Sequence, residues 1–182
     1  VNLMSVIKSA VAKYGRPQMF NFDNGSSYKN KQMELLAACI SSVIHYDQPY
    51  TPTQKAKIER WFRTMKNQWM SSLDIRDFHS LDELRGNLLA YVQKYNQTIH
   101  SSLNGKSPQD RFFSKPNRIR RLSDEEIEHS FLLEIERRVS ADGVIVIDQV
   151  EYEVDCRFAK QRIKLRYSPN LDDIFIVEAD GT

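Results

Sequence analysis

In the first part of the chain, the spacing of apolar residues predicts a helix, a strand, a second helix and a second strand, in that order. Those from Leu3 to Val11 lie three and four positions apart, which predicts a helix that Gly15 ends. Residues 19–22 predict a short strand before a turn at Asn24-Gly25. Apolar residues from Met33 to Ile40 predict a second helix, and "SVIHY" predicts a second strand. The alternation of helix and strand predicts an α/β fold.

Further helices are predicted after "DQPYTPTQ", a segment whose two prolines indicate a loop. The first of these helices holds Glu59. Ser80 and Glu83 form the pattern of a capping box, which opens a long helix. Ser107 and Pro108 begin another helix, because proline suits the first helical position.

The pattern changes in the last third of the chain. Residues 115–122 have many cations and no apolar periodicity, which indicates a linker, and Ser123 with Glu126 offers a second capping box. From about residue 131, short alternating runs of apolar residues predict about five strands, and so short a series suggests a small barrel. We therefore predict an α/β part at 1–114, a basic and acidic linker at 115–130 and a small all-β domain at 131–182.

Composition excludes several classes of protein. The chain has 182 residues and a net charge of +2, and its charged share of 27% is ordinary for a globular protein. No apolar run approaches the ~20 residues that span a bilayer, so we expect no membrane partner. Cys39 and Cys156 lie far apart and lack metal-ligand spacing, which indicates free thiols and a cytoplasmic location.

The distribution of charge is more informative than its total. Cations gather in residues 54–66, 111–121 and 160–166, with one acid in the first segment and none in the other two. Such runs are often no more than solvated faces. Three acid-poor runs in one chain nevertheless favour surfaces that bind nucleic acid.

One carboxylate, Glu59, stands inside the first basic segment. On a helical wheel it shares a stripe with Lys55, Arg63 and Lys66, beside an apolar stripe that ends at Trp69. One interpretation is a set of ion pairs one turn apart, each stabilising the helix by about 0.3–0.5 kcal/mol. The other is a metal ligand beside a bound polyanion.

A second carboxylate, Asp23, follows the first strand. It fits an ordinary turn, which "DNG" favours. A carboxylate at a strand end can also face a cleft, and Mg²⁺ is held by a few carboxylates together with substrate phosphates. Two such ions can drive an in-line displacement at a phosphodiester.

These two carboxylates lie in segments that resemble a known family. "FDNGSSY", a spacing of 35 residues between Asp23 and Glu59, and "KAKIERWFRTMK" resemble the second and third signature blocks of Asp-Asp-35-Glu transposases and retroviral-type integrases. Lys66 matches a basic residue that many members carry, and residues 95–112 resemble the stretch after the family's catalytic helix. The strand-rich end resembles the small barrel of phage Mu-type transposases. The resemblance covers roughly residues 1–177.

The resemblance implies a fold and an activity. The fold is a partial ribonuclease H-like core of helix, strand and helices, followed by an SH3-like barrel. The activity is that of a DNA transposase or integrase, which cleaves DNA ends and transfers them to target DNA in transposition. Asp23 and Glu59 would be the second and third catalytic acids and would hold two Mg²⁺ or Mn²⁺ ions. The expected partners are transposon ends, target DNA and further copies of the chain, at the nucleoid of a bacterial cytoplasm.

One departure from the family concerns its first catalytic Asp, which precedes the first helix of the core. Residues 1–22 contain no Asp or Glu. We therefore expect the chain to be the later part of a catalytic core, inactive in cleavage and joining on its own.

Two groups of residues are expected to contact DNA. Around the catalytic helix these are Tyr50, Gln54, Lys55, Lys57, Arg60, Arg63 and Lys66. In the barrel they are Lys160, Arg162, Lys164 and Arg166, whose alternation predicts one exposed basic face with Ile163 and Leu165 inside. Two alternatives stay open: a DNA-binding and assembly piece whose acids are relics, and a nuclease of ribonuclease H type without strand transfer.

Overall fold

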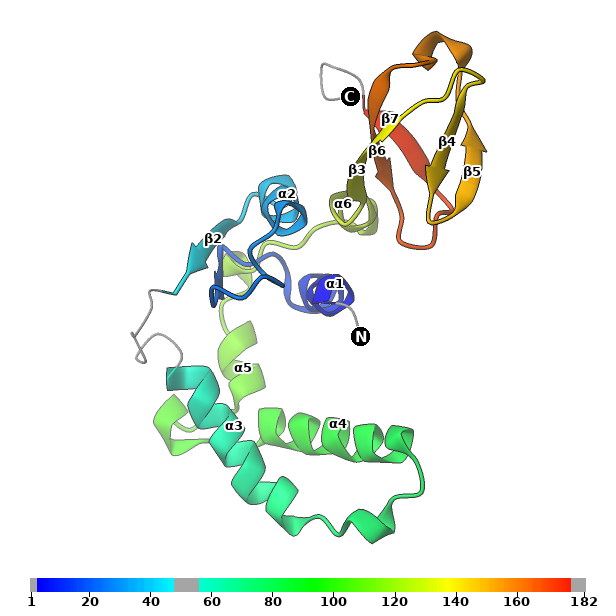
Figure 1. Ribbon diagram of the computed structural model, residues 1–182. Coiled ribbons are helices and arrows are strands. Elements are labelled where there is room, and N and C mark those ends of the chain that lie inside the picture. The colour runs from blue at the N-terminus through cyan, green and yellow to red at the C-terminus, as the bar shows by residue number, and fades with distance from the viewer. Residues whose placement is uncertain (1–2, 48–55, 178–182) are drawn as a thin grey trace. The chain divides into compact units, whose positions relative to one another are not determined.

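The computed structural model in Figure 1 describes residues 3–47 and 56–177. The chain divides into two compact units, one of residues 1–45 with 121–182 and the other of residues 46–120. None of the helices in the described ranges is long and apolar enough to cross a membrane. Cys39 and Cys156 are both free thiols, as the sequence predicts.

The first unit begins with the helix-and-strand alternation that the sequence predicts. Its elements are α1 (Leu3–Tyr14), β1 (Met19–Phe22), α2 (Lys31–Cys39) and β2 (Val43–Tyr46). Gly15 ends α1 with a φ of 82°, and its N–H bonds the Val11 carbonyl at 2.8 Å. A left-handed residue is the usual helix stop, and glycine adopts that conformation without strain. Asn30 caps α2 through a bond from the Met33 N–H.

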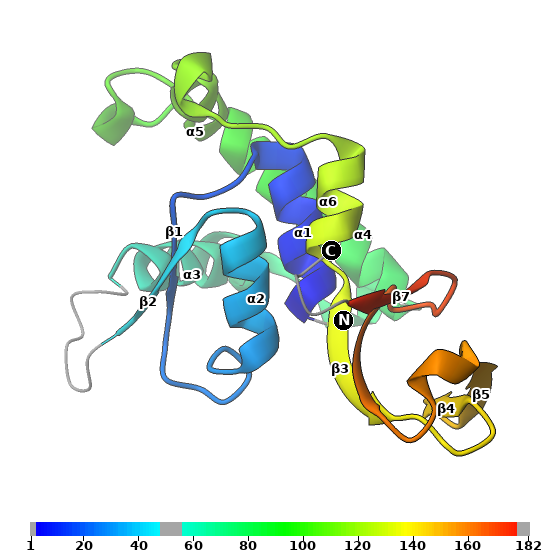
Figure 2. The same ribbon diagram turned by 90° about the horizontal axis from the view of Figure 1, so that it is seen from above.

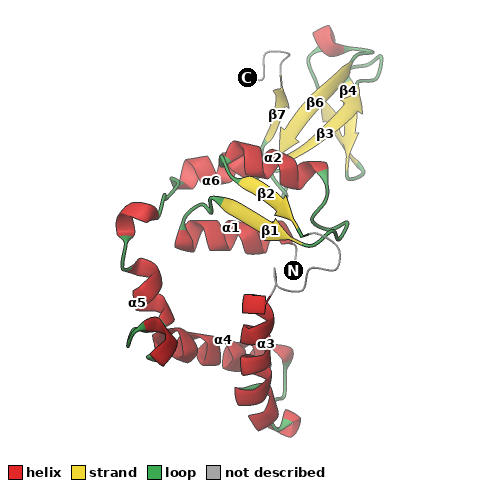
Figure 3. Ribbon diagram, turned by 90° about the vertical axis from the view of Figure 1, so that its left-hand side faces the viewer, coloured by secondary structure: helices red, strands yellow, loops and turns green. Residues whose placement is uncertain are grey.

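The strands β1 and β2 form a two-stranded sheet and run in the same direction, with α2 as their crossover (Figure 3). One face of this sheet, with Phe20, Phe22 and Ile44, packs on the core of the unit. On the opposite face Met19 is 55% and Val43 59% exposed. Among the described residues of its unit, only one face of this sheet is therefore covered.

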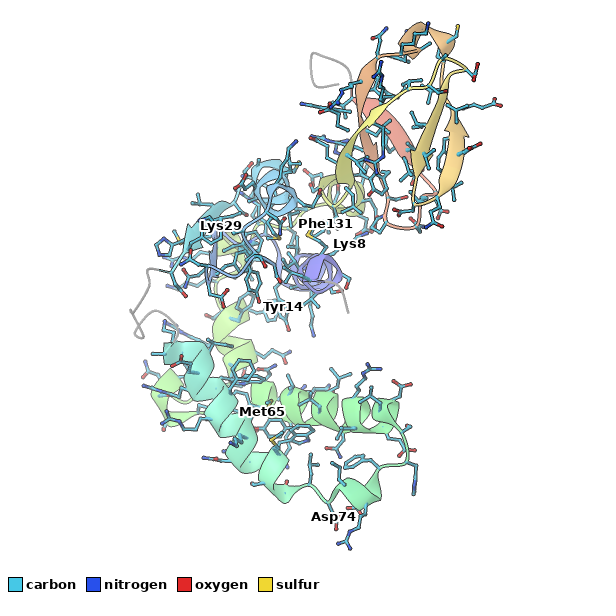
Figure 4. The ribbon with its side chains drawn as sticks, viewed as in Figure 1. Lys8, Tyr14, Lys29, Met65, Asp74 and Phe131 are labelled. Carbon is cyan, nitrogen blue, oxygen red and sulfur yellow. The ribbon has the colours of Figure 1, made fainter. Side chains whose placement is uncertain are left out.

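The helix α6 (Asp124–Ser130) completes the core of the first unit. Ile127 and Phe131 are 5% and 3% exposed and pack with apolar residues of α1 and α2. Lys8 pairs with Glu128 at 2.6 Å, and α1 and α6 lie side by side (Figure 2). Figure 4 shows Lys8 and Phe131 at this junction.

The predicted linker at 115–130 thus differs from the structure in its second half. Residues 116–118 form a single 3-10 turn (η5, Pro116–Arg118), whereas 124–130 form a packed helix. The predicted capping box of Ser123 and Glu126 is present in both directions. Within its seven residues α6 offers Ile127 alone as a large apolar side chain, so its sequence showed no stripe that would have placed it in a core.

Five strands follow, in the number that the sequence predicts. They are β3 (Leu133–Arg138), β4 (Val144–Ile147), β5 (Val150–Glu153), β6 (Arg162–Tyr167) and β7 (Ile174–Val177). An antiparallel sheet in the order β3-β6-β7 and the hairpin β4-β5 enclose a small core built around Ile147 and Leu165, both fully buried. The predicted fold class, a mixed helix-and-strand part followed by a small all-β part, is confirmed.

Two residues of α2 hold the start of β3. Gln32 donates to the Leu132 carbonyl at 2.9 Å and accepts from the Glu134 N–H at 3.1 Å. Lys31 pairs with the Glu134 carboxylate at 3.2 Å. These bonds connect the start of β3 to α2.

The second unit is helical. Its elements are α3 (Ala56–Gln68), the 3-10 turns η2 (Met70–Ser72) and η3 (Ile75–Asp77), α4 (Leu81–Gln97), η4 (Ser101–Leu103) and α5 (Pro108–Phe113). Ser80 and Ser107 cap α4 and α5 as predicted. Glu83, however, accepts from the His79 N–H and not from Ser80.

The apolar stripe of α3 is buried at one end. Trp69 is 9% exposed, and its indole N–H donates to Asn87 of α4 at 2.7 Å. Met65 lies on the side of α3 that faces α4 (Figure 4). Ile58 and Phe62 are 49% and 51% exposed, so the N-terminal half of this helix packs against little in its unit.

Candidate functional site

Asp23 lies directly after β1, where the sequence predicts a carboxylate at a strand end. Its side chain is half-buried, and its Oδ1 accepts a hydrogen bond from the Gly25 N–H at 2.8 Å. This bond fixes one carboxylate oxygen toward the turn. A Cβ atom at position 25 would lie 2.7 Å from that same oxygen, so the turn accepts only glycine without moving Asp23.

Aromatic stacking anchors the turn that follows Asp23. The Tyr28 ring stacks on Phe22 at a centroid distance of 4.7 Å, and Phe22 stacks on Phe20 at 5.5 Å. The Tyr28 N–H also bonds the Gly25 carbonyl at 3.0 Å. Strand and turn therefore hold Asp23 from both sides. The Asn-Gly pair signals this turn in the sequence, but the contribution of Tyr28 could not be seen there.

Glu59 occupies the first turn of α3 and is exposed. A negative charge at a helix N-terminus is favourable, because it meets the positive end of the helix dipole. Among the described residues Glu59 makes no ion pair, and neither does Arg63 one turn further on. The ion pair between Glu59 and Arg63, one of those that the sequence suggested, is therefore absent from the described part of the chain. Its other half, Lys55, lies outside the described residues.

The cations of α3 form an exposed basic surface. This surface, the α3 basic face, consists of Lys57, Arg60, Arg63 and Lys66. In the part of the chain that the structure describes, none of the four is in an ion pair. Tyr50 and Gln54, which the sequence also assigns to DNA contact, precede the described part of α3 and lie outside the described residues.

Asp23 belongs to the first unit and Glu59 to the second, so the prediction that the two carboxylates meet stays a prediction. Within residues 3–47 and 56–177, no three His, Cys, Asp or Glu side chains lie so that they could hold a metal ion. The donor chemistry nevertheless fits Mg²⁺, which prefers carboxylate oxygens and water.

The predicted basic face of the barrel is wrong in part. Ile163 and Leu165 point inward as expected, at 6% and 0% exposed. Arg166, however, is half-buried and pairs with the buried carboxylate of Glu134 at 3.5 Å, and Arg162 lies 3.3 Å from Glu136.

These pairs arise because β3 lies beside β6. Glu134 stands opposite Arg166, and Glu136 stands opposite Lys164. Lys160 precedes β6 in a left-handed conformation with φ of 64°, so it does not continue the alternation of the strand. Glu134 and Glu136 of β3, which is distant in sequence, thus reduce the positive charge that β6 exposes to solvent.

Comparison with known proteins finds a family match for part of the chain. Residues 41–108 match the integrase core domain family, a segment that includes Glu59 and the α3 basic face and excludes Asp23. The chain is 26% identical over 174 residues to the transposase for transposon Tn552 of Staphylococcus aureus. This alignment covers 86% of the chain and 35% of the relative, so the chain spans about a third of that protein's length.

A similar solved structure is one chain of the cryo-EM structure of the simian T-cell lymphotropic virus intasome in complex with the PP2A regulatory subunit B56 gamma. The TM-score is 0.45 at 15% sequence identity, with 91% of this chain and 64% of the other covered.

Proposed function

We propose that the chain is part of a transposase or integrase, a metal-dependent polynucleotidyl transferase that cleaves DNA ends and joins them to target DNA. The observation that carries the proposal is Glu59. It lies inside the segment that matches the integrase core, on an exposed basic helix, and has no ion pair among the described residues. If Glu59 served only to stabilise the helix, we would expect it to form an ion pair with a cation one turn away.

In this proposal the two carboxylates have one role. Asp23 and Glu59 hold Mg²⁺ or Mn²⁺, two ions in the complete site, and a third acid together with DNA phosphates supplies further oxygen ligands. When bound, such a pair of ions activates the attacking oxygen and stabilises the leaving one. The Gly25 N–H holds one Asp23 oxygen toward the turn, so the carboxylate is oriented before any ligand arrives.

The α3 basic face has a second role, the binding of phosphate. Its four cations are exposed, and contacts with phosphate position a protein on DNA without reading sequence. Tyr50, Gln54 and Lys55 extend this proposed contact before α3. The partners would be transposon ends and target DNA, bound by several copies of the protein at the nucleoid of a bacterial cytoplasm.

The proposal is tested by a joining assay on the full-length protein with Mg²⁺ and a labelled DNA end. We expect Glu59→Gln to abolish both cleavage and joining while DNA binding changes little. Glu34→Gln is the matched control, since Glu34 is also an exposed glutamate in the first turn of a helix, α2. It should leave both reactions at the wild-type rate.

The same assay separates the alternatives. Binding without cleavage or joining in either Mg²⁺ or Mn²⁺ would indicate a DNA-binding and assembly protein whose acids are relics. Cleavage without joining would indicate a nuclease of ribonuclease H type. Joining that survives Glu59→Gln would show that this carboxylate is not part of the active site.

A further inference from the structure

The C-terminal end of α3 is attached to α4 by two side-chain hydrogen bonds. Trp69, directly after α3, is buried, and its indole N–H donates to the Asn87 side chain at 2.7 Å. The Tyr91 hydroxyl, one turn further along α4, donates to the Gln68 side chain at 3.1 Å. The Tyr91 ring also lies beside the Trp69 indole, at a centroid distance of 6.4 Å. We call these four residues, Gln68, Trp69, Asn87 and Tyr91, the α3–α4 clamp.

The N-terminal half of α3 is held differently. Ile58 and Phe62 are about half exposed, and Glu59 between them is exposed. Within the described residues of the second unit, no side-chain hydrogen bond or ion pair joins this half of the helix to α4 or α5. The carboxylate that we propose as a metal ligand thus stands at the end of α3 that is remote from the clamp.

This arrangement makes the position of Glu59 sensitive to the direction of the helix. Glu59 and Trp69 are ten residues apart, which is about 15 Å along a helix that rises about 1.5 Å per residue. A tilt of about 4° at the clamp would therefore move the Glu59 carboxylate by about 1 Å. A misplacement of that size can slow a catalysed reaction by about 10²-fold.

The hydrogen bond from Trp69 is suited to fixing this direction. Hydrogen bonds weaken steeply away from a linear geometry, whereas apolar contact between rings has no direction of its own. A buried indole N–H requires an acceptor, but the acceptor need not be a side chain. Asn87 is exposed, so water could reach the N–H if this side chain were shortened. What Asn87 adds is an acceptor held at one place on α4.

We propose that Asn87 is a positioning residue for the reaction, which fixes the direction of α3 through Trp69 and thereby places the Glu59 carboxylate. The proposal rests on the proposed function, in which Glu59 holds a metal ion. Loss of the acceptor should slow the joining step and leave the affinity for DNA nearly unaltered. The long, flexible side chains of the α3 basic face can follow a small tilt of the helix, but a metal ligand must keep its place.

The test is single-turnover joining of a labelled DNA end by the full-length protein at saturating DNA. The Kd for DNA and the urea midpoint are measured for each variant. Asn87→Ala removes the acceptor and should lower the joining rate by about 10–100-fold, with the Kd nearly unaltered. Asn87→Asp keeps an oxygen at the same position and should restore the rate. A residue that only stabilised the fold would change the rate and the urea midpoint together.

Two matched variants separate positioning from stability. Trp69→Phe keeps an aromatic ring and removes the N–H donor, so it should slow joining as Asn87→Ala does. The double variant should be no slower than either single one, because both changes remove the same bond. Ser80→Ala is the control, since Ser80 caps the same helix by accepting the Glu83 N–H at 3.2 Å. It should lower the urea midpoint and leave the joining rate unaltered.

The outcomes distinguish this proposal from the proposed function. Joining by the wild-type protein, abolished by Glu59→Gln, together with an unchanged rate in Asn87→Ala would refute the positioning role alone. Trp69→Phe decides the same question if Asn87→Ala does not fold. An equal fall in Ser80→Ala, or no recovery in Asn87→Asp, would also overturn the positioning role. A wild-type protein that neither cleaves nor joins DNA would overturn both proposals.

Discussion

Substitution of Gly25 by alanine tests whether the position of the Asp23 carboxylate limits catalysis. The backbone at Gly25 is outside the left-handed region, so alanine fits its conformation. The new Cβ would stand 2.7 Å from Asp23 Oδ1, well inside van der Waals contact, and next nearest to the Tyr28 ring at 3.6 Å. The carboxylate must therefore move, because it is the nearest flexible group.

The size of the effect follows from that distance. To reach an ordinary van der Waals distance from the new Cβ, Asp23 Oδ1 must move away by several tenths of an ångström. This movement also lengthens the hydrogen bond that Oδ1 accepts from the N–H of residue 25. A misplacement of about 1 Å can slow a catalysed reaction by about 10²-fold. We therefore expect the joining rate of the full-length protein to fall by about 10–100-fold. The free energy of unfolding should fall by only about 1 kcal/mol, as for one hydrogen bond.

The assay is single-turnover joining of a labelled DNA end, with binding measured in parallel. Gly86→Ala is the control, since Gly86 lies within α4 and a Cβ there would meet nothing within 4 Å. It should leave the joining rate unchanged and stabilise the helix by about 0.5–1 kcal/mol. A Gly25→Ala protein that joins DNA at the wild-type rate would refute the role of Asp23 or of its turn.

Two further predictions concern the packing of α6 and the α3 basic face. Ile127→Ala should lower the free energy of unfolding by about 2–5 kcal/mol, because a buried side chain leaves a cavity, whereas Ile75→Ala, at a position 79% exposed, should change it by less than about 0.5 kcal/mol. If the two substitutions had equally small effects in urea denaturation, residues 124–130 would be a linker and not a packed helix. Arg63→Ala and Lys66→Ala should each reduce the salt slope of DNA binding by about 0.9 for all sequences. A loss of affinity for one sequence only, with the slope unaltered, would contradict a phosphate contact.

The elements whose positions the sequence predicted are those with a local signal. The first helix has a full apolar face and a glycine stop, and α4 and α5 begin at serine caps. What the sequence could not predict depends on partners distant along the chain. Ile127 packs on α1 although more than a hundred residues separate them, and a seven-residue helix with one large apolar side chain shows no periodicity that would indicate it.

The candidate site divides in the same way. Asp23 and Glu59 could be selected by their spacing and by the segments around them, both of which are properties of the linear sequence. The charge of β6 could not be judged, because Glu134 and Glu136 reach it through the pairing register of β3.

The composition of α3 is poorly suited to stability and well suited to a polyanion. Arg60 and Arg63, and again Arg63 and Lys66, stand three positions apart, a spacing at which like charges destabilise a helix by about 0.2–0.5 kcal/mol per pair. The one acid of the helix, Glu59, stands one turn before Arg63, where an ion pair could relieve part of this repulsion, yet it forms none among the described residues. It lies in the first turn, where the helix dipole favours its charge. Phosphates that neutralise the cations would remove this repulsion. Under the proposed function, DNA therefore completes the electrostatics of the helix, and the Glu59 carboxylate is left to bind a metal ion.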